Sequence, residues 1–279
     1  MIECGEASAL LTGVRRVPAI DIDGLKVNYT DRGSGVCIVF VPGLAGTKEW
    51  FNYQVSGLSD RYRIVSYDLR RARGRAARSS YTLDQLVDDL DRLLSALHIH
   101  EAAIAGHSLG GLIALQFALA HPDRCSLLIL SSTAPCYSNV SEAELASYYI
   151  PGGFQREGLL GALKRLLFGH KPGLEDESDP LALLRQSVRD LDAGTLAVRL
   201  KLLREVDMTP VLGEIVVPTL VVAGSLEMPQ ILAGAQTLEQ NMSRSSLEII
   251  EGADQFHFYT SHDRFNAIVA DFVAHNIRP

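Results

Sequence analysis

Residues 102-AAIAGHSLGGLIALQFALA-120 decide the fold of this chain. The short apolar run Ala102–Gly106 predicts a buried strand, and the longer run Leu109–Ala120 predicts a helix. The pattern Gly-x-Ser-x-Gly lies between them, centred on Ser108. A serine in that position is held on a tight turn, and the flanking glycines leave room for close backbone approach. We therefore expect Ser108 to project above the sheet as a nucleophile.

The predicted helix adds a second reason for placing chemistry here. Its first N–H groups have no partner within the helix, and its dipole favours negative charge at this end. An ordinary glycine-rich strand-to-helix turn is the alternative interpretation.

Around this segment, short strand-like runs alternate with helical patterns, which is typical of a mainly parallel sheet covered by helices. The dipeptide Asp23-Gly24 predicts a two-residue hairpin turn. The expected strands are Ala19–Ile22, Lys26–Asp31, Val36–Val41, Arg63–Tyr67, Ala102–Gly106, Leu127–Ser131, Thr219–Gly224 and Leu247–Glu251, and the expected helices include Leu83–Leu97, Leu109–Ala120 and Arg264–Ile277.

One stretch interrupts the alternation. Between about residues 137 and 210 there is no convincing strand, whereas Leu159–Phe168 and Leu181–Leu191 have helical patterns. An insert of this size between two strands is best explained as a helical cap. We expect residues 1–136 and 211–279 to form the core domain and residues 137–210 the cap.

Composition excludes several classes. The net charge of the 279 residues is −7, whereas nucleic-acid binding needs a basic face. No apolar run approaches the roughly 18 residues needed to span a bilayer, and Met1–Val14 lacks the features of a secretory signal. No cofactor motif or metal-ligand spacing occurs, so no cofactor is expected.

Cys37 and Cys125 fall in apolar runs and are expected to be buried free thiols, which fits the cytoplasm. No feature indicates an oligomeric state.

The chain resembles the α/β-hydrolase fold family from Leu25 to Phe272, in the branch of cap-bearing esterases, lactonases and C–C hydrolases. The resemblance implies an eight-stranded, mostly parallel sheet flanked by helices, with a helical cap. The segment 39-VFVPGL-44 matches the strand and loop that supply an oxyanion-hole N–H, although relatives usually have His-Gly where Pro42-Gly43 stands. The resemblance implies that the N–H groups of Leu44 and Leu109 bind the oxyanion.

The same resemblance suggests the other site residues. Gly43 would contact the substrate, and Trp50 is either a pocket-lining aromatic residue or a core tryptophan. Relatives show Gly-x-x-Asp after the strand that follows the cap, and Glu227 falls on that position in 224-GSLE-227. A glutamate can orient a histidine as an aspartate does.

The expected base departs from the family pattern. Relatives have a segment like Gly-Ala-Gly-His-Phe, whereas this chain has 252-GADQFH-257 and places Gln255 at the histidine position. A glutamine amide cannot accept the proton of Ser108. Three interpretations stay open: His257 is the base, the chain has abandoned hydrolysis, or Gln255 is an engineered replacement. The first assumes an extended segment, in which residues 255 and 257 point the same way.

The segment after the strand Arg63–Tyr67 also departs from the family. It is rich in arginine, and it forms either a solvated loop or a docking site for an anionic group or carrier. The candidate contacts are Arg70, Arg71, Arg73 and Arg75.

The function implied is a serine hydrolase that attacks a small apolar ester, lactone or similar carbonyl compound. The alternative is a non-hydrolytic enzyme of the same fold, such as a cyclase or eliminase, because Gln255 occupies the usual histidine position. A ligand-binding sensor is the third possibility.

Overall fold

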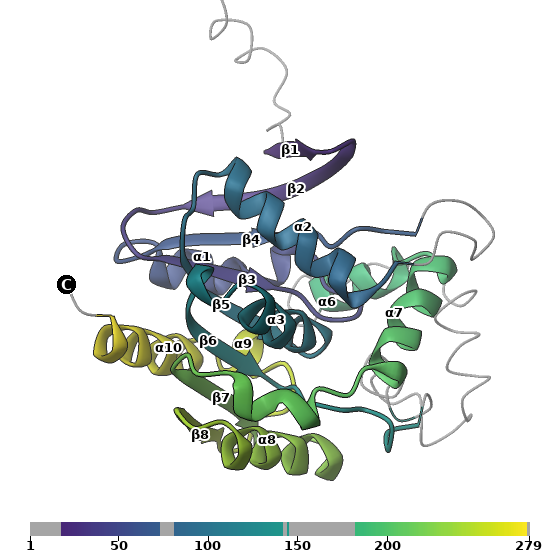
Figure 1. Cartoon of the computed structure of the whole chain (residues 1–279), viewed down its shortest axis with the longest axis vertical. Coiled ribbons are helices and arrows are strands. Elements are labelled where there is room, and N and C mark those ends of the chain that lie inside the picture. The colour runs from purple at the N-terminus through teal and green to yellow at the C-terminus, as the bar shows by residue number, and fades with distance from the viewer. Residues whose placement is uncertain (1–17, 73–80, 142–143, 145–181, 278–279) are drawn as a thin grey trace, which may run out of the picture.

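The computed structural model describes residues 18–72, 81–141, 144 and 182–277. Eight strands form one sheet in the order β1-β2-β4-β3-β5-β6-β7-β8 (Figure 1). The strands are β1 (Ala19–Ile22), β2 (Leu25–Arg32), β3 (Cys37–Val41), β4 (Arg63–Tyr67), β5 (Ala102–His107), β6 (Cys125–Ser131), β7 (Thr219–Gly224) and β8 (Ser245–Ile250). The α-helices are α1 (Asn52–Leu58), α2 (Leu83–Ala96), α3 (Leu109–Ala120), α6 (Ala182–Arg189), α7 (Ala193–Glu205), α8 (Pro229–Asn241), α9 (His257–Thr260) and α10 (His262–Asn276), with 3₁₀ turns at Lys48–Phe51, Pro122–Arg124 and Thr209–Glu214.

The sheet is antiparallel only at its N-terminal edge. β1 pairs with β2 and β2 with β4 in antiparallel register, and every other neighbouring pair is parallel. The hairpin between β1 and β2 turns at Asp23 and Gly24, with φ of 52° and 80°. Two successive positive φ values are what a type I′ turn requires. The predicted mostly parallel sheet and its hairpin are confirmed.

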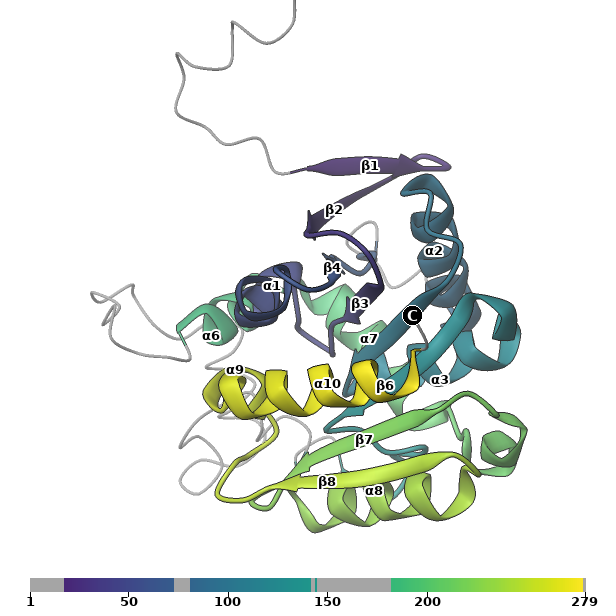
Figure 2. The ribbon, with the colours of Figure 1, turned by 90° about the vertical axis from the view of Figure 1, so that its left-hand side faces the viewer.

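Helices cover both faces of the sheet (Figure 2). One core cluster joins the strands to α2, α3 and α8, and the other joins them to α1, α9 and α10. The five residues of β3 are all buried, which explains its continuous apolar sequence, since a central parallel strand is covered on both sides. Cys37 and Cys125 are buried free thiols, as expected.

The sequence patterns did not predict α1, α8 or α9. For α8 the signal was present, because Pro229 occupies its first turn and Ile231, Ala235 and Leu238 are buried at helical spacing. α1 and α9 have only seven and four residues, too few for a periodic pattern.

None of the helices in the described part of the chain is long and apolar enough to cross a membrane.

The stretch assigned to the cap contributes α6 and α7 to the described residues. Figure 1 shows both helices (green) at the opposite end of the molecule from the C-terminus. An isolated bridge between Cys136 and Asp207 brings the two ends of this stretch side by side. The predicted helix Leu159–Phe168 lies outside the described residues, and the domain boundaries at 137 and 210 stay a prediction.

Candidate active site

Ser108 occupies a strained turn between β5 and α3. Its backbone has φ 52° and ψ −117°, a region that non-glycine residues rarely adopt. The turn depends on two close backbone contacts. A Cβ at Gly106 would lie 2.2 Å from the Gly110 carbonyl oxygen, and one at Gly110 would lie 2.1 Å from that of Val41. The two glycines of the motif therefore permit the turn that presents the Ser108 side chain.

Two backbone amides stand beside this turn. The contact between Gly110 and Val41 packs the start of α3 against the loop that carries Gly43 and Leu44, and a Cβ at Gly43 would lie 3.2 Å from that of Ser108. Within the described part of the chain, neither the Leu44 nor the Leu109 N–H donates to a protein acceptor. Such unengaged amides next to a nucleophile are suited to binding an oxyanion.

Tyr137 is a site residue that the sequence analysis missed. Its buried hydroxyl accepts a hydrogen bond from the Ala134 N–H at 3.2 Å and lies 3.1 Å from Thr133 Oγ1. Thr133 Oγ1 in turn donates to the Ser108 carbonyl at 2.8 Å, which links Tyr137 to the turn. Burial raises the pKa of Tyr137, so the phenol stays protonated at neutral pH. The available signal was its place just after β6, because loops at the carboxyl ends of adjacent parallel strands meet.

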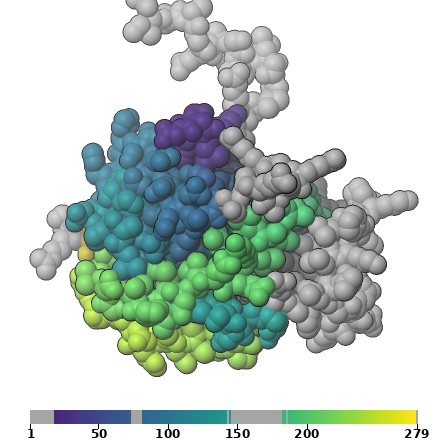
Figure 3. Space-filling model, turned by 45° about the vertical axis from the view of Figure 1, so that its right-hand side comes forward, coloured from purple at the N-terminus to yellow at the C-terminus, as the bar shows by residue number. Residues whose placement is uncertain are grey.

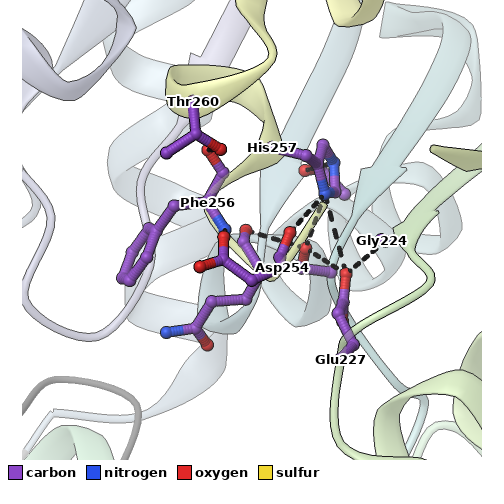
Figure 4. A network of polar contacts seen from close by, with 9 residues as sticks. Gly224, Glu227, Asp254, Phe256, His257 and Thr260 are labelled. Atoms are coloured by element: carbon purple, nitrogen blue, oxygen red, sulfur yellow. Dashed lines mark hydrogen bonds and ion pairs between the residues drawn. The ribbon is translucent and has the colours of Figure 1, made fainter. Parts of the chain in front are cut away.

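Glu227 and His257 form a buried pair near Ser108. Glu227, on the turn after β7, accepts hydrogen bonds through Oε1 from the Gly224 N–H at 2.8 Å and from the Ser132 hydroxyl at 2.7 Å. His257 Nδ1 lies 3.6 Å from the same oxygen, and neither side chain is exposed. Figure 4 shows the two side chains facing each other from the β7 turn and the start of α9. The structure thus brings together two of the predicted site residues.

Burial sets the charge of this pair. It raises the pKa of Glu227 to about 7 and lowers that of His257 to about 4. His257 is therefore neutral at pH 7, whereas Glu227 titrates there. The Oε2 atom of Glu227 is buried with no partner among the described residues, consistent with a carboxyl that is poorly compensated when charged.

The ring of His257 is bonded to residues other than Ser108. Nε2 lies 3.0 Å from Ser131 Oγ, while Nδ1 lies 3.3 Å from Ser132 Oγ and 3.2 Å from the Asp254 carbonyl oxygen. None of the interactions of the ring in the described structure reaches Ser108. The two residues are nevertheless neighbours through Ser131, because its carbonyl accepts the Ser108 N–H at 3.0 Å.

The assumption of an extended segment at Gln255 is wrong. Phe256 has φ −96° and ψ 26°, and α9 begins at His257. Because the chain already turns into a helix here, residues 255 and 257 point in different directions, roughly 160° apart in helical geometry. Gln255 is buried, and its carbonyl oxygen lies 2.9 Å from Ser132 Oγ. Its catalytic role stays a prediction.

Trp50 lies in the core on the α1 and α10 side of the sheet. It is fully buried, its indole N–H donates to Ser187 Oγ at 2.8 Å, and its ring is 5.7 Å from that of Phe256. These contacts account for the tryptophan structurally, and a contact with substrate stays a prediction.

Two residues of the arginine-rich segment, Arg70 and Arg71, are engaged in interactions within the chain. Arg70 forms a two-point ion pair with Asp89, and Arg71 Nη1 donates to the Asp190 carbonyl at 3.0 Å. Arg73 and Arg75 lie outside the described residues.

No group of three His, Cys, Asp or Glu side chains suited to a metal ion occurs among the residues described.

Comparison with known proteins agrees with this architecture. The chain is 28% identical over 238 residues to 3-oxoadipate enol-lactonase 2 of Acinetobacter baylyi, covering 82% of this chain and 86% of the relative. It is also 28% identical over 258 residues to the pimeloyl-[acyl-carrier protein] methyl ester esterase of Aeromonas hydrophila, covering 89% and 100%. The crystal structure of the enol-lactonase from Burkholderia xenovorans superposes with a TM-score of 0.73 at 23% identity, covering 92% of this chain and all of that one. The family model described as the alpha/beta hydrolase fold matches residues 36–259, and the chain therefore belongs to the α/β-hydrolase fold family.

Proposed function

We propose that this chain is a serine hydrolase that cleaves a small apolar ester or lactone by nucleophilic acyl transfer. The observation that carries the proposal is the strained backbone of Ser108, held beside the unengaged N–H groups of Leu44 and Leu109. A strained conformation of this kind persists only where the surrounding structure enforces it, and such sites cluster where function needs them.

The reaction follows from these groups. Ser108 Oγ attacks the substrate carbonyl carbon, and the Leu44 and Leu109 amides hold the oxyanion. The oxyanion collapses, the C–O bond to the leaving group breaks, and the leaving oxygen takes up the serine proton. Water then attacks the acyl-enzyme in the same way and releases the acid. Each oxyanion donor contributes about 3 kcal/mol to such a barrier.

For the proton transfers we propose His257, oriented by Glu227. His257 is neutral at pH 7 and can accept a proton, and the Glu227 carboxyl is adjacent to its Nδ1 atom. The ring must exchange its contact with Ser131 for one with Ser108. Catalytic hydrogen bonds that are missing without substrate often form only in the complex.

The names of two relatives support the substrate class. One is an enol-lactonase and the other a methyl ester esterase, so both names describe cleavage of an ester bond. Gly43 lies against Ser108 and would contact the acyl group. A cytoplasmic location is part of this proposal.

Hydrolysis of p-nitrophenyl acetate and butyrate tests the proposal on the unchanged chain, Ser108→Ala, His257→Ala and Gln255→His. We expect turnover in the unchanged chain, a loss of about 10⁴–10⁶ in Ser108→Ala and of about 10²–10⁴ in His257→Ala. Turnover unaffected by Ser108→Ala would refute the nucleophile. Turnover unaffected by His257→Ala would refute the base alone.

One observation favours a second function. His257 is hydrogen-bonded to Ser131, and Gln255 occupies the position of the family's histidine. The Leu44 and Leu109 amides can therefore polarise a substrate carbonyl in a site where no base among the described residues contacts Ser108. A non-hydrolytic enzyme or a sensor would use it in this way. Such a protein would bind an apolar carbonyl ligand yet resist labelling of Ser108 by a fluorophosphonate. A gain of several orders of magnitude in Gln255→His would indicate an intact but empty histidine position, whether evolved or engineered.

The anionic partner proposed for the arginine-rich segment rests on Arg73 and Arg75. The name of the esterase relative includes an acyl-carrier protein, and arginine is suited to an anionic group because its guanidinium binds phosphate and carboxylate at two points. We would measure turnover of a carrier-linked ester at increasing salt concentration. A fall in turnover with salt, and a further fall in the double variant Arg73→Ala/Arg75→Ala, would support this partner. Equal turnover in that double variant would exclude it.

A further inference from the structure

A buried arginine on α7 reaches the loop of the oxyanion hole. Arg199 is only 2% exposed, and its guanidinium is surrounded by neutral acceptors. Nη1 donates to the Leu44 carbonyl at 2.6 Å, and the remaining bonds go to the carbonyls of Leu69 and Arg70 and to the Tyr81 hydroxyl, at 3.2–3.3 Å. Among the described residues, no carboxylate pairs with Arg199.

Burying a charge without a counter-ion is unfavourable unless hydrogen bonds compensate for it. Arg199 has four such bonds, and the shortest one goes to Leu44, whose N–H is the proposed oxyanion donor. Other bonds hold the same loop at its flanks, since the Gly46 N–H donates to the Gly43 carbonyl at 3.1 Å and the Lys48 N–H to Asp68 at 2.9 Å. The Leu44 carbonyl itself is held by Arg199.

We propose that Arg199 is a positioning residue that sets the direction of the Leu44 N–H in the oxyanion hole. This inference rests on the proposed function of the same site. By fixing the Leu44 carbonyl, the guanidinium restricts rotation of the Leu44 backbone, and hence the amide on its other side. Preorganised donors stabilise an oxyanion because they need no reorientation during the reaction.

The same helix makes a second contact with the segment that Arg199 holds. Thr195 Oγ1, one turn earlier on α7, accepts the Ala72 N–H at 2.8 Å. In the space-filling view of Figure 3, the green surface that includes α7 lies directly against blue residues from the first hundred positions. α7 is therefore anchored both to this segment and to the Leu44 loop.

The chemistry of the side chain explains why arginine is suited to this position. Its planar fork carries five donors and can bind several carbonyls at fixed angles. A lysine keeps the positive charge but offers one compact ammonium group. Arg199→Lys should therefore keep the charge yet reach fewer of the four acceptors, whereas Arg199→Met keeps much of the bulk and none of the donors.

The experiment compares Arg199→Met and Arg199→Lys with Lys201→Met, an exposed residue two positions later on the same helix. For each variant, kcat and KM for p-nitrophenyl butyrate are measured per folded active site, counted by fluorophosphonate titration of Ser108. We expect kcat to fall about 10²-fold in Arg199→Met, as for the loss of one oxyanion donor, with KM changed less than about threefold. Arg199→Lys should recover part of the loss, and Lys201→Met should match the unchanged chain.

Hydrogen exchange of the backbone amides in residues 41–50 provides a readout that does not need catalysis. It should accelerate in folded Arg199→Met and not in Lys201→Met. If the unchanged chain fails to hydrolyse esters, the proposed function fails, while exchange still tests the anchoring of the loop. Unchanged exchange, or a kcat per active site equal to that of Lys201→Met, would overturn the role of Arg199.

Discussion

Ser131 connects His257 to Ser108. Its hydroxyl oxygen lies 3.0 Å from His257 Nε2, and its carbonyl accepts the Ser108 N–H at 3.0 Å. The candidate base is therefore adjacent to the candidate nucleophile, but the nitrogen that would take the proton is engaged with a different serine. We expect the ease with which the hydrogen bond between Ser131 and His257 breaks to control the rate of hydrolysis.

Replacing Ser131 with alanine tests this relationship. The change frees Nε2, and we expect hydrolysis of p-nitrophenyl butyrate to accelerate several-fold. Removing one partner of a buried polar atom costs about 1–3 kcal/mol, so the urea midpoint should fall at the same time.

Ser126→Ala, on the same strand, serves as the matched control for Ser131→Ala and should change neither quantity. Slower turnover in Ser131→Ala would show instead that the Ser131 hydroxyl is needed for catalysis where it stands.

The dependence of activity on pH should have two steps. Protonation of His257 abolishes the base, and because burial lowers its pKa to about 4, this loss of kcat/KM should occur only near that pH. Ionisation of Glu227, whose pKa is raised to about 7, places a negative charge beside the ring and should increase the rate as pH rises through 7. The pH profile of Glu227→Gln should lose the step near 7 and keep the acid limb. One step near the ordinary histidine pKa in both proteins would contradict this assignment.

The same carboxyl should make stability depend on pH. The folded chain holds the Glu227 proton up to about pH 7, whereas the unfolded chain releases it near 4.5. The folded state therefore binds more protons between these values, and its stability falls as pH rises through them.

Glu227→Gln lacks this loss, so its free energy of unfolding relative to the unchanged chain should increase by on the order of 3 kcal/mol from pH 4.5 to pH 8. Urea unfolding at both pH values measures the difference. The buried histidines titrate in both proteins and cancel in the comparison. An unchanged difference would mean that Glu227 is compensated when charged.

Gly106→Ala should disrupt the turn at Ser108. The new methyl group would lie 2.2 Å from a backbone oxygen of Gly110, which cannot move without displacing α3. We expect a loss of at least about 2 kcal/mol in urea unfolding. Gly213→Ala is the control, because the nearest atom to its Cβ would be 4.0 Å away, and its stability should be nearly unchanged. Equal stability in both variants would refute the contact.

Much of the fold is encoded in local sequence. The apolar run of β3, the Asp23-Gly24 turn and the passage from β5 through Ser108 into α3 were all predicted, because each depends on residues a few positions apart. The family resemblance also located Glu227, since its turn follows directly from β7. The short helices α1 and α9 escaped prediction, because they are too short to show a period.

The direction of each site side chain depended on the tertiary structure. His257 was expected beside Gln255 on an extended segment, but the chain turns into α9 and directs the ring to Ser131 and Glu227. Tyr137 and Arg199 showed no motif, because they reach the Ser108 turn and the Leu44 loop from a different loop and a different helix. By itself, the sequence determined the turn that presents Ser108, because neighbouring residues fix local backbone geometry. Only the packing of distant segments decided which groups surround Ser108, because buried polar atoms must find their partners wherever the fold places them.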